Sequence, residues 1–310
     1  MATSERAGRI AGYAFVAPAI LLMLVILIVP MGIAATLSFT DYSLGNPSFN
    51  WVGLGNYERL VSRTRYERMF QATFTYVFVA APLTILLGLG AALLINSLAW
   101  GRDFYKTVYF LPVMATLIAM AIVWQFALHP TVGIVNDLLG GLCGTWLELG
   151  WVARRCEDGF PNWLGDRDYA IWVVIFVGVW QGFGFNMVLY LAGLTAIPRD
   201  LYAAAEMDGA RTAWDRFRLV TWPMLGPTTV FVVTISIIRA FQVFDIVEAF
   251  YPQGAGPGRS AYVILFAIFE KGVKENLIGI GAAITVVFLV FVLAVTLAQK
   301  TLLERRVHYG

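Results

Sequence analysis

The sequence predicts an all-α, polytopic integral membrane protein with six transmembrane helices. Apolar residues make up 59% of the 310 residues and charged residues only 14%. Mean hydropathy is +0.72, and uncharged runs long enough to cross a bilayer recur along the chain. This composition departs from that of soluble domains toward that of membrane proteins and excludes a soluble 310-residue domain.

The six predicted spans follow the uncharged runs in order. They cover residues 10–40, 69–100, 107–128, 169–198, 219–238 and 276–299. Residues 241–250 extend the fifth run despite their charges, so we place that helix near 226–250. A seventh apolar patch, 262–269, is too short to cross and predicts a helix at the outer surface or a partial re-entry.

The amino-terminal tail, residues 1–9, carries Arg6 and Arg9 before the first apolar run and so imitates a signal peptide. The run is too long for a signal sequence and lacks a convincing cleavage site, which favours a retained anchor. An even number of spans places both termini on one side of the membrane. Lys and Arg residues divide almost equally between the two sides, so the positive-inside rule does not choose between them.

A polar segment between the fourth and fifth spans, IPRDLYAAAEMDGARTAWDRFRLVTWP at 197–223, predicts a helix over about 199–218. Pro198 and Asp200 suit its first turn, and Gly209 gives it a flexible point without a bulky side chain. Trp214, Phe217 and Val220 lie three apart and are expected on one face. From the residues alone, an amphipathic loop helix without a partner is the favoured interpretation.

This segment resembles the Glu-Ala-Ala loop of permease subunits in ABC importers, above all the carbohydrate-uptake group that includes the maltose, lactose and glycerol-phosphate systems. The matching residues are Ala204, Ala205, Asp208, Gly209, Ala210, Phe217 and Pro223. Ala203 stands where the family usually has its glutamate, and Glu206 is a candidate substitute. Further matches are WVGLGNY at 51–57, FLP at 110–112, GIVN at 133–136 and FQVFDIV at 241–247.

The resemblance implies the type I importer permease fold, with a cytoplasmic coupling helix that docks into a cleft on an ATPase subunit. It implies these partners and ligands: a second homologous permease, two ATPase subunits, an extracytoplasmic solute-binding protein and a sugar-like solute. Both termini would be cytoplasmic in a bacterial or archaeal inner membrane. The expected parts are residues 1–68 with the tail, first span and outer loop, a core at 69–299, and a tail at 300–310.

No phosphate-binding loop or known catalytic signature occurs in the sequence. We therefore expect no enzyme activity, no catalytic residue and no cofactor in this chain. ATP and Mg²⁺ would be bound by the partner ATPase subunits, and their closure would drive alternating access.

Polar residues inside the spans are candidates for a solute pathway, because a charged group facing lipid costs about 3 kcal/mol. In the fifth span, Arg239, Gln242, Asp245 and Glu248 form a row spaced by three. The fourth span combines aromatic and amide groups: Trp180, Gln181, Phe185, Asn186 and Tyr190. The resemblance points to Gln181, Gly182 and Phe185, and also to Phe241 and Gln242. Helix–helix packing is the alternative role of these residues.

Residues 129–168 form a long loop that holds both cysteines, Cys143 and Cys156. In an oxidising exterior they could form a disulfide. The alternative is two free thiols, one of them in an interfacial helix over 138–149. No metal site is expected, because two cysteines and His129 provide too few ligands.

Two rival functions remain from the residues alone. A stand-alone secondary transporter or channel would use Arg239, Asp245 and Glu248 as ion-coupling groups. An intramembrane enzyme would need a nucleophile with a base or metal ligands in facing spans, and Ser97, His129 and Asp137 do not have that spacing. The sequence does not choose among sugars, polyols and their phosphates or sulfonates.

Overall fold

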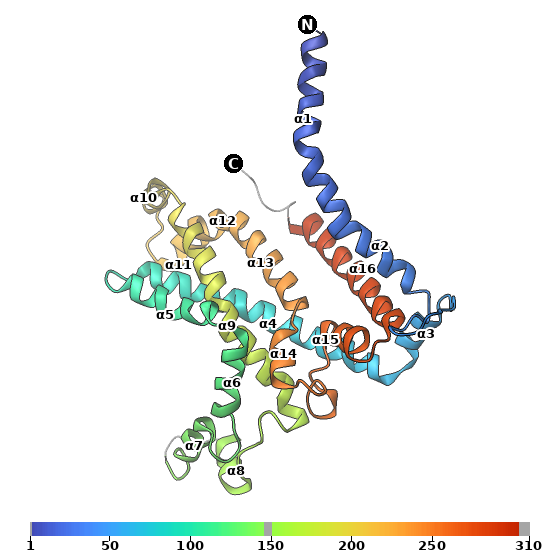
Figure 1. The fold of residues 1–310 in the computed structure, drawn as a ribbon. Coiled ribbons are helices and arrows are strands. Elements are labelled where there is room, and N and C mark those ends of the chain that lie inside the picture. The colour runs from blue at the N-terminus through green and yellow to red at the C-terminus, as the bar shows by residue number, and fades with distance from the viewer. Residues whose placement is uncertain (1, 146–150, 304–310) are drawn as a thin grey trace. The chain divides into compact units, whose positions relative to one another are not determined.

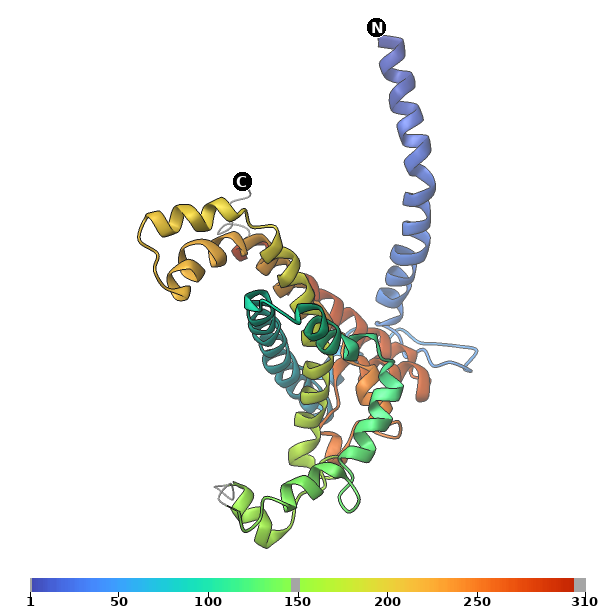
Figure 2. The same ribbon diagram turned by 90° about the vertical axis from the view of Figure 1, so that its left-hand side faces the viewer.

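The computed structural model describes residues 2–145 and 151–303, and helices dominate these ranges (Figures 1 and 2). The β-pairing within them is one isolated bridge between Thr40 and Trp51. The all-α prediction is confirmed. The chain divides into two compact units, residues 1–63 with 267–290 and residues 64–266 with 291–310. The end of the predicted carboxy-terminal tail, 304–310, lies outside the described residues.

The first unit begins with one long apolar helix, built from α1 (Ala2–Met23), a π-helical turn (Leu24–Ile28) and α2 (Val29–Leu37). A short α3 (Gly55–Ser62) follows the loop that carries the WVGLGNY motif. Asn56 of this motif is buried, and its Nδ2 donates to the carbonyls of Ser38 at 2.9 Å and Thr40 at 2.8 Å. The motif thus closes the loop that follows the first span.

The second unit is built on two long helices, α4 (Thr64–Ser97) and α9 (Arg167–Thr195), which pack along each other. Gly88 permits this close approach, because a Cβ there would lie 2.6 Å from the Asn186 Cβ. Helix α13 (Gly226–Phe241) packs on both. The last helix, α16 (Ile278–Leu303), begins in the first unit and ends in the second, where Phe291 contacts Phe74 with ring centroids 5.4 Å apart.

The third predicted span, 107–128, is not one helix. It consists of α5 (Arg102–Met114) and α6 (Leu117–Ala127), which meet at 97°. Ala115 and Thr116 are extended between them, so the backbone leaves the helical path just after Pro112. The described chain therefore has five helices long and apolar enough to cross a membrane, or six if the bent pair counts as one span.

The fifth span covers Gly226–Phe250, as predicted, but it is also broken. Helix α13 ends at Phe241, Phe244 is non-helical with φ −149° and ψ −59°, and α14 occupies Asp245–Phe250. The predicted row of Arg239, Gln242, Asp245 and Glu248 on one continuous helix is therefore wrong. Arg239 lies in the last turn of α13, whereas Asp245 and Glu248 lie in the first turn of α14.

The apolar patch 262–269 forms the six-residue α15 (Ile264–Phe269), followed by a π-helical turn (Glu270–Lys274). Tyr262, Val263 and Phe266 are fully buried, and the Ile264 amide donates to Thr73 Oγ1 of α4 at 3.0 Å.

The loop between α6 and α9 folds into a small lobe with two helices, α7 (Ile134–Gly140) and α8 (Trp151–Asp158). Cys143 and Cys156 are joined by a disulfide, with Cα atoms 5.8 Å apart. Helix α7 ends at Gly140, so the alternative helix over 138–149 is not formed in its described part. Residues 146–150 lie outside the described chain. His129 is exposed in the loop after α6, where its Nδ1 accepts from the Thr131 amide at 3.3 Å.

Candidate functional site: a polar cavity and an exposed segment after α9

A cavity of about 420 Å³ opens in the second unit between α4, the α5–α6 bend, α9 and the break between α13 and α14. Five residues predicted for the solute pathway line it: Gln181, Gly182, Arg239, Gln242 and Asp245. The sequence analysis missed Tyr76, Gly178 and Phe244, which also line it. Tyr76 could not be found from its own span, because an apolar run with one tyrosine shows nothing about the face on which that tyrosine lies.

The polar residues of the lining are accessible from the cavity. Arg239, Gln242 and Asp245 are exposed although they lie within a candidate span, and all three line the same cavity. The break after α13 produces this arrangement, because it places the carboxylate of Asp245 at the positive amino-terminal end of α14. A water-filled cavity thereby lowers the cost of the charges within the span.

Arg239 is held by an aromatic ring. Its guanidinium carbon lies 3.9 Å from the centroid of the Phe185 ring, at the distance of a cation–π contact. Phe185, a predicted pathway residue, thus supports the cation of the cavity from α9. Gln181 is anchored differently, since its Nε2 donates to the carbonyl of Ala115 in the α5–α6 bend at 3.4 Å.

A smaller recess of about 80 Å³ adjoins the cavity and shares Tyr76, Gly178, Gly182 and Arg239 with it. Asn186, another predicted residue, lines this recess, and its Nδ2 donates to Ser236 Oγ at 2.9 Å. Both side chains are buried. The hydrogen bond joins α9 to α13 across the recess.

Four predicted pathway residues line neither space: Phe185, which contacts Arg239, and three others that lie away from both. Trp180 packs edge-on against Trp124, with centroids 5.5 Å apart. Tyr190 is fully buried in the hydrophobic core. Phe241 is buried and contacts Phe291 at 5.3 Å. For these residues the alternative of helix–helix packing describes the observed contacts.

The segment after α9 is not the single helix predicted over 199–218. Helix α10 (Arg199–Met207) ends before Gly209, which has a φ of +98°, and α11 (Ala213–Arg216) then begins. Thr212 and Asp215 form a capping box: Thr212 N donates to Asp215 Oδ2 at 2.9 Å, and Asp215 N donates to Thr212 Oγ1 at 3.1 Å. Hydrogen bonds to the carboxylate from the Thr212 side chain and from the Thr212 backbone lower the pKa of Asp215 below its usual value.

The two sides of this segment differ in burial. Ala205, Ala210 and Val220 face inward and are 5–9% exposed. The opposite side carries several predicted coupling residues that are exposed: Ala203, Ala204, Glu206, Asp208, Gly209 and Pro223. Met207, at 88% exposed, lies among them. Small side chains around a protruding methionine leave the backbone accessible to a partner.

The predicted common face of Trp214, Phe217 and Val220 is wrong. Trp214 is 67% exposed, whereas Val220 is 6% exposed. A π-helical turn at Phe217–Thr221 changes the helical phase between them. Trp214 and the half-buried Phe217 still stack, with centroids 5.4 Å apart.

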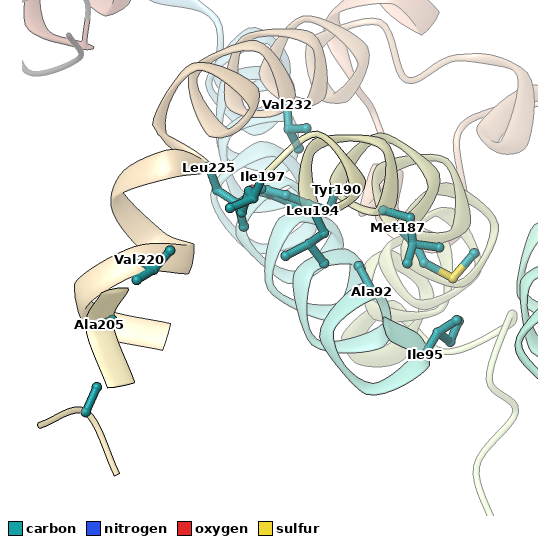
Figure 3. Packing of buried hydrophobic residues seen from close by; sticks show 12 residues of the cluster. Ala92, Ile95, Met187, Tyr190, Leu194, Ile197, Ala205, Val220, Leu225 and Val232 are labelled. Carbon is teal, nitrogen blue, oxygen red and sulfur yellow. The ribbon is translucent and has the colours of Figure 1, made fainter. Parts of the chain in front are cut away.

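The inward side belongs to one core with the long helices (Figure 3). The cluster includes Ala205, Ala210 and Val220 of the segment together with Leu194 and Ile197 at the end of α9. Two further contacts fix the fold of the segment: the Tyr202 and Thr221 hydroxyls are 3.1 Å apart, and Glu206 pairs with Arg216 at 3.1 Å. The segment therefore forms a structured protrusion on α9 rather than a loose loop.

Fold and site together define a polytopic membrane protein with a polar internal cavity and an exposed helical segment, residues 197–223, after α9. The chain belongs to the binding-protein-dependent transport system inner membrane component family, which it matches over residues 84–309.

Several relatives are permeases of ABC transporters. The chain is 32% identical over 308 residues to the probable ABC transporter permease protein YesP of Bacillus subtilis, covering 99% of this chain and 94% of that protein. It is 31% identical over 288 residues to the trehalose/maltose transport system permease protein MalF of Thermococcus litoralis, covering 92% and 91%. These relatives support a carbohydrate-type importer permease in the inner membrane.

A solved structure of a bacterial alginate ABC transporter, in complex with an alginate pentasaccharide-bound periplasmic protein, has the same fold as this chain. The TM-score is 0.80 at 23% identity, and the alignment covers 99% of this chain and 98% of that one.

Proposed function

We propose that this chain is the membrane-spanning permease subunit of an ATP-driven importer and moves a sugar or sugar-like solute by alternating access. The observation that carries the proposal is the role of α9. Near its middle this helix lines the polar cavity through Gln181 and Gly182. At its end it packs against residues 197–223, which we propose to be the docking segment for an ATPase and call by that name below. Fourteen residues, or about 20 Å of helix, separate Gln181 from Thr195. Movement of the segment would thus act directly on the cavity wall.

The disulfide supports an orientation that does not depend on the family resemblance. Disulfides persist in oxidising compartments and are rare in the cytosol, so the lobe with Cys143 and Cys156 belongs outside the cytoplasm. In both views the lobe and α10 lie at opposite ends of α9 (Figures 1 and 2). The docking segment would then be cytoplasmic, and with six spans both termini would be cytoplasmic as well.

The proposed partners follow from this arrangement. A cytoplasmic ATPase subunit would receive the exposed face around Ala204 and Gly209, and it would bind the ATP and Mg²⁺. A second, homologous permease would complete the cavity, a second ATPase would serve that permease, and an extracytoplasmic binding protein would deliver the solute. The relatives named for trehalose and maltose and for alginate support a carbohydrate-like solute.

Co-purification from native membranes through a tag on this chain tests the proposal. We expect a second permease and two ATPase copies to be recovered, with ATP hydrolysis stimulated by a solute-loaded binding protein. Recovery of this chain alone, together with solute movement in vesicles without ATP, would contradict it. That second outcome would favour the stand-alone transporter, for which the structure provides no continuous row of Arg239, Asp245 and Glu248.

A further inference from the structure

Two polar groups that line the recess, the Tyr76 hydroxyl and the Arg239 guanidinium, keep hydrogen-bonding capacity for a ligand. Tyr76 is 7% exposed and lines both the recess and the cavity. Within residues 2–145 and 151–303, its hydroxyl forms no hydrogen bond and the Arg239 guanidinium forms no ion pair. Both groups line the recess and can hydrogen-bond to water until a ligand replaces it. A ligand that enters the recess would find both groups available.

The two spaces share Arg239 but differ in net charge. Arg239 is the one charged residue among those lining the recess, whereas Asp245 lines only the larger cavity. The recess is therefore positive and the outer cavity carries the compensating acid. A space of about 80 Å³ holds several water-sized groups and so has room for a carboxylate or a phosphate group.

The stacking of Arg239 prepares it for an anion. Contact with the Phe185 ring at 3.9 Å holds the cation without consuming its hydrogen-bond donors through an ion pair. The planar guanidinium matches the geometry of carboxylate and phosphate oxygens. Tyr76 adds a hydroxyl donor from a different helix, α4.

Gly178 makes room for that hydroxyl. A Cβ at this position would lie 2.2 Å from Tyr76 Oη, so any larger residue would displace the ring. Tyr76 and Gly178 come from α4 and α9, and their fit keeps the hydroxyl at the wall shared by the recess and the cavity.

We propose that the recess is an anion subsite, in which Arg239 and Tyr76 bind a carboxylate or phosphate group of the transported solute. The substrate class would then be an acidic sugar or a phosphorylated polyol, with its neutral part in the larger cavity. The inference rests on the proposed function, since the solute has to enter this cavity.

Matched pairs of probes test the subsite on the transporter assembled with its own partner subunits in nanodiscs. Galacturonate is compared with galactose, and glycerol phosphate with glycerol, by the concentration dependence of thermal stabilisation. We expect the anionic member of at least one pair to bind about tenfold tighter or more, as charge-assisted hydrogen bonds predict. The pair that shows the preference separates a carboxylate ligand from a phosphate ligand. The preference should weaken as NaCl is raised, because salt screens the attraction.

Substitutions test whether Arg239 and Tyr76 cause the preference for the anionic probe. Arg239→Gln should abolish it, Arg239→Lys should retain part of it, and Tyr76→Phe should reduce binding of the anionic probe more than that of the neutral one. Tyr105→Phe is the matched control, because it removes a tyrosine hydroxyl from α5 outside the lining of either space. A merely structural role of Arg239 at the end of α13 would change the unfolding temperature without changing the preference.

Equal or undetectable binding of both members of both pairs would overturn the subsite, as would a preference that survives in Arg239→Gln. Co-purification and ATP hydrolysis are measured on the same preparations. If the ATPase subunits assemble with this chain but no anion preference is found, the subsite fails while the proposed importer function stands.

Discussion

The two parts of the chain that adjoin the ends of α9 are held together internally by different means. At one end, the lobe around α7 and α8 is joined by a disulfide between Cys143 and Cys156. At the other end, the docking segment is held by packing of Ala205, Ala210 and Val220 and by short-range hydrogen bonds. A covalent link keeps its two residues at a fixed distance. Packing contacts can shift with a displaced partner and then form again. The noncovalent end is therefore the one suited to moving with a partner.

Substitutions at two adjacent alanines test most directly whether the docking segment has an outer docking face and an inner packed face. Ala204 is exposed on the docking face and Ala205 is 9% exposed in the core. Ala204→Trp should abolish recovery of the ATPase subunits while leaving the unfolding temperature nearly unchanged. Ala205→Trp should lower the unfolding temperature, because overpacking a core costs about 1–3 kcal/mol. Co-purification and thermal unfolding of both variants measure the two effects.

The alanine pair is its own control, since the two substitutions are chemically the same. If Ala204→Trp left ATPase recovery intact, the exposed face would not be the docking surface. Equal loss of stability in both variants would show that the segment does not have an inner and an outer side.

The lobe should respond to loss of its disulfide and the docking segment should not. The double substitution Cys143→Ser and Cys156→Ser avoids a leftover thiol and opens a loop closed over a sequence separation of 13. Chain-entropy arguments give about 3 kcal/mol for a loop of this size. Limited proteolysis from the outside of sealed vesicles should then cleave between α6 and α9, with ATPase recovery unchanged. Unchanged resistance of the lobe to the protease would show that its other contacts keep it folded without the disulfide.

The sequence predicted the parts of this molecule that depend on local patterns. Composition predicted the apolar spans, and Gly209 with Ala210 predicted a flexible point without bulky side chains in the segment after α9. The breaks at Ala115–Thr116 and at Phe244 were not predicted. An apolar run continues through the first, and the second lies within residues 241–250, which extend the fifth predicted span. These breaks depend on contacts made by distant elements, such as the hydrogen bond from Gln181 on α9 to the Ala115 carbonyl.

The residues that line the cavity were likewise predicted only in part from the sequence. Residue type alone indicated Gln181, Gln242 and Asp245, because amides and carboxylates are rare in spans. It also indicated Tyr190, whose ring is fully buried in the core. Tyr76 and Tyr190 have the same chemistry, and only the packing of α4 against α9 decides which tyrosine reaches the cavity.

Acid should loosen the docking segment through its capping box. The pKa of Asp215 is lowered by hydrogen bonds from Thr212, so the contribution of the ionised carboxylate is fully present above the unfolded-state pKa near 3.8. It is lost as pH falls through the lower folded-state pKa. Amide exchange at the start of α11 should therefore rise relative to α10 in that acidic window. Asp215→Asn should remove this pH dependence, and a rise that persists in it would assign the effect to another group.

The smallest effect should come from the ion pair between Glu206 and Arg216. Both side chains are about half exposed, at 57% and 44%, so water screens their attraction. Exposed pairs contribute about 0–1 kcal/mol, and we expect Glu206→Gln to change the unfolding temperature little. This substitution also tests the docking face. Glu206 lies on that exposed face, and Ala203 occupies the position where the family usually has its glutamate. If Glu206 contacts the ATPase directly, Glu206→Gln should weaken ATPase recovery at moderate salt while Arg216→Gln, which frees the carboxylate, should not. Equal weakening by both substitutions would instead assign the pair a purely structural role within the segment.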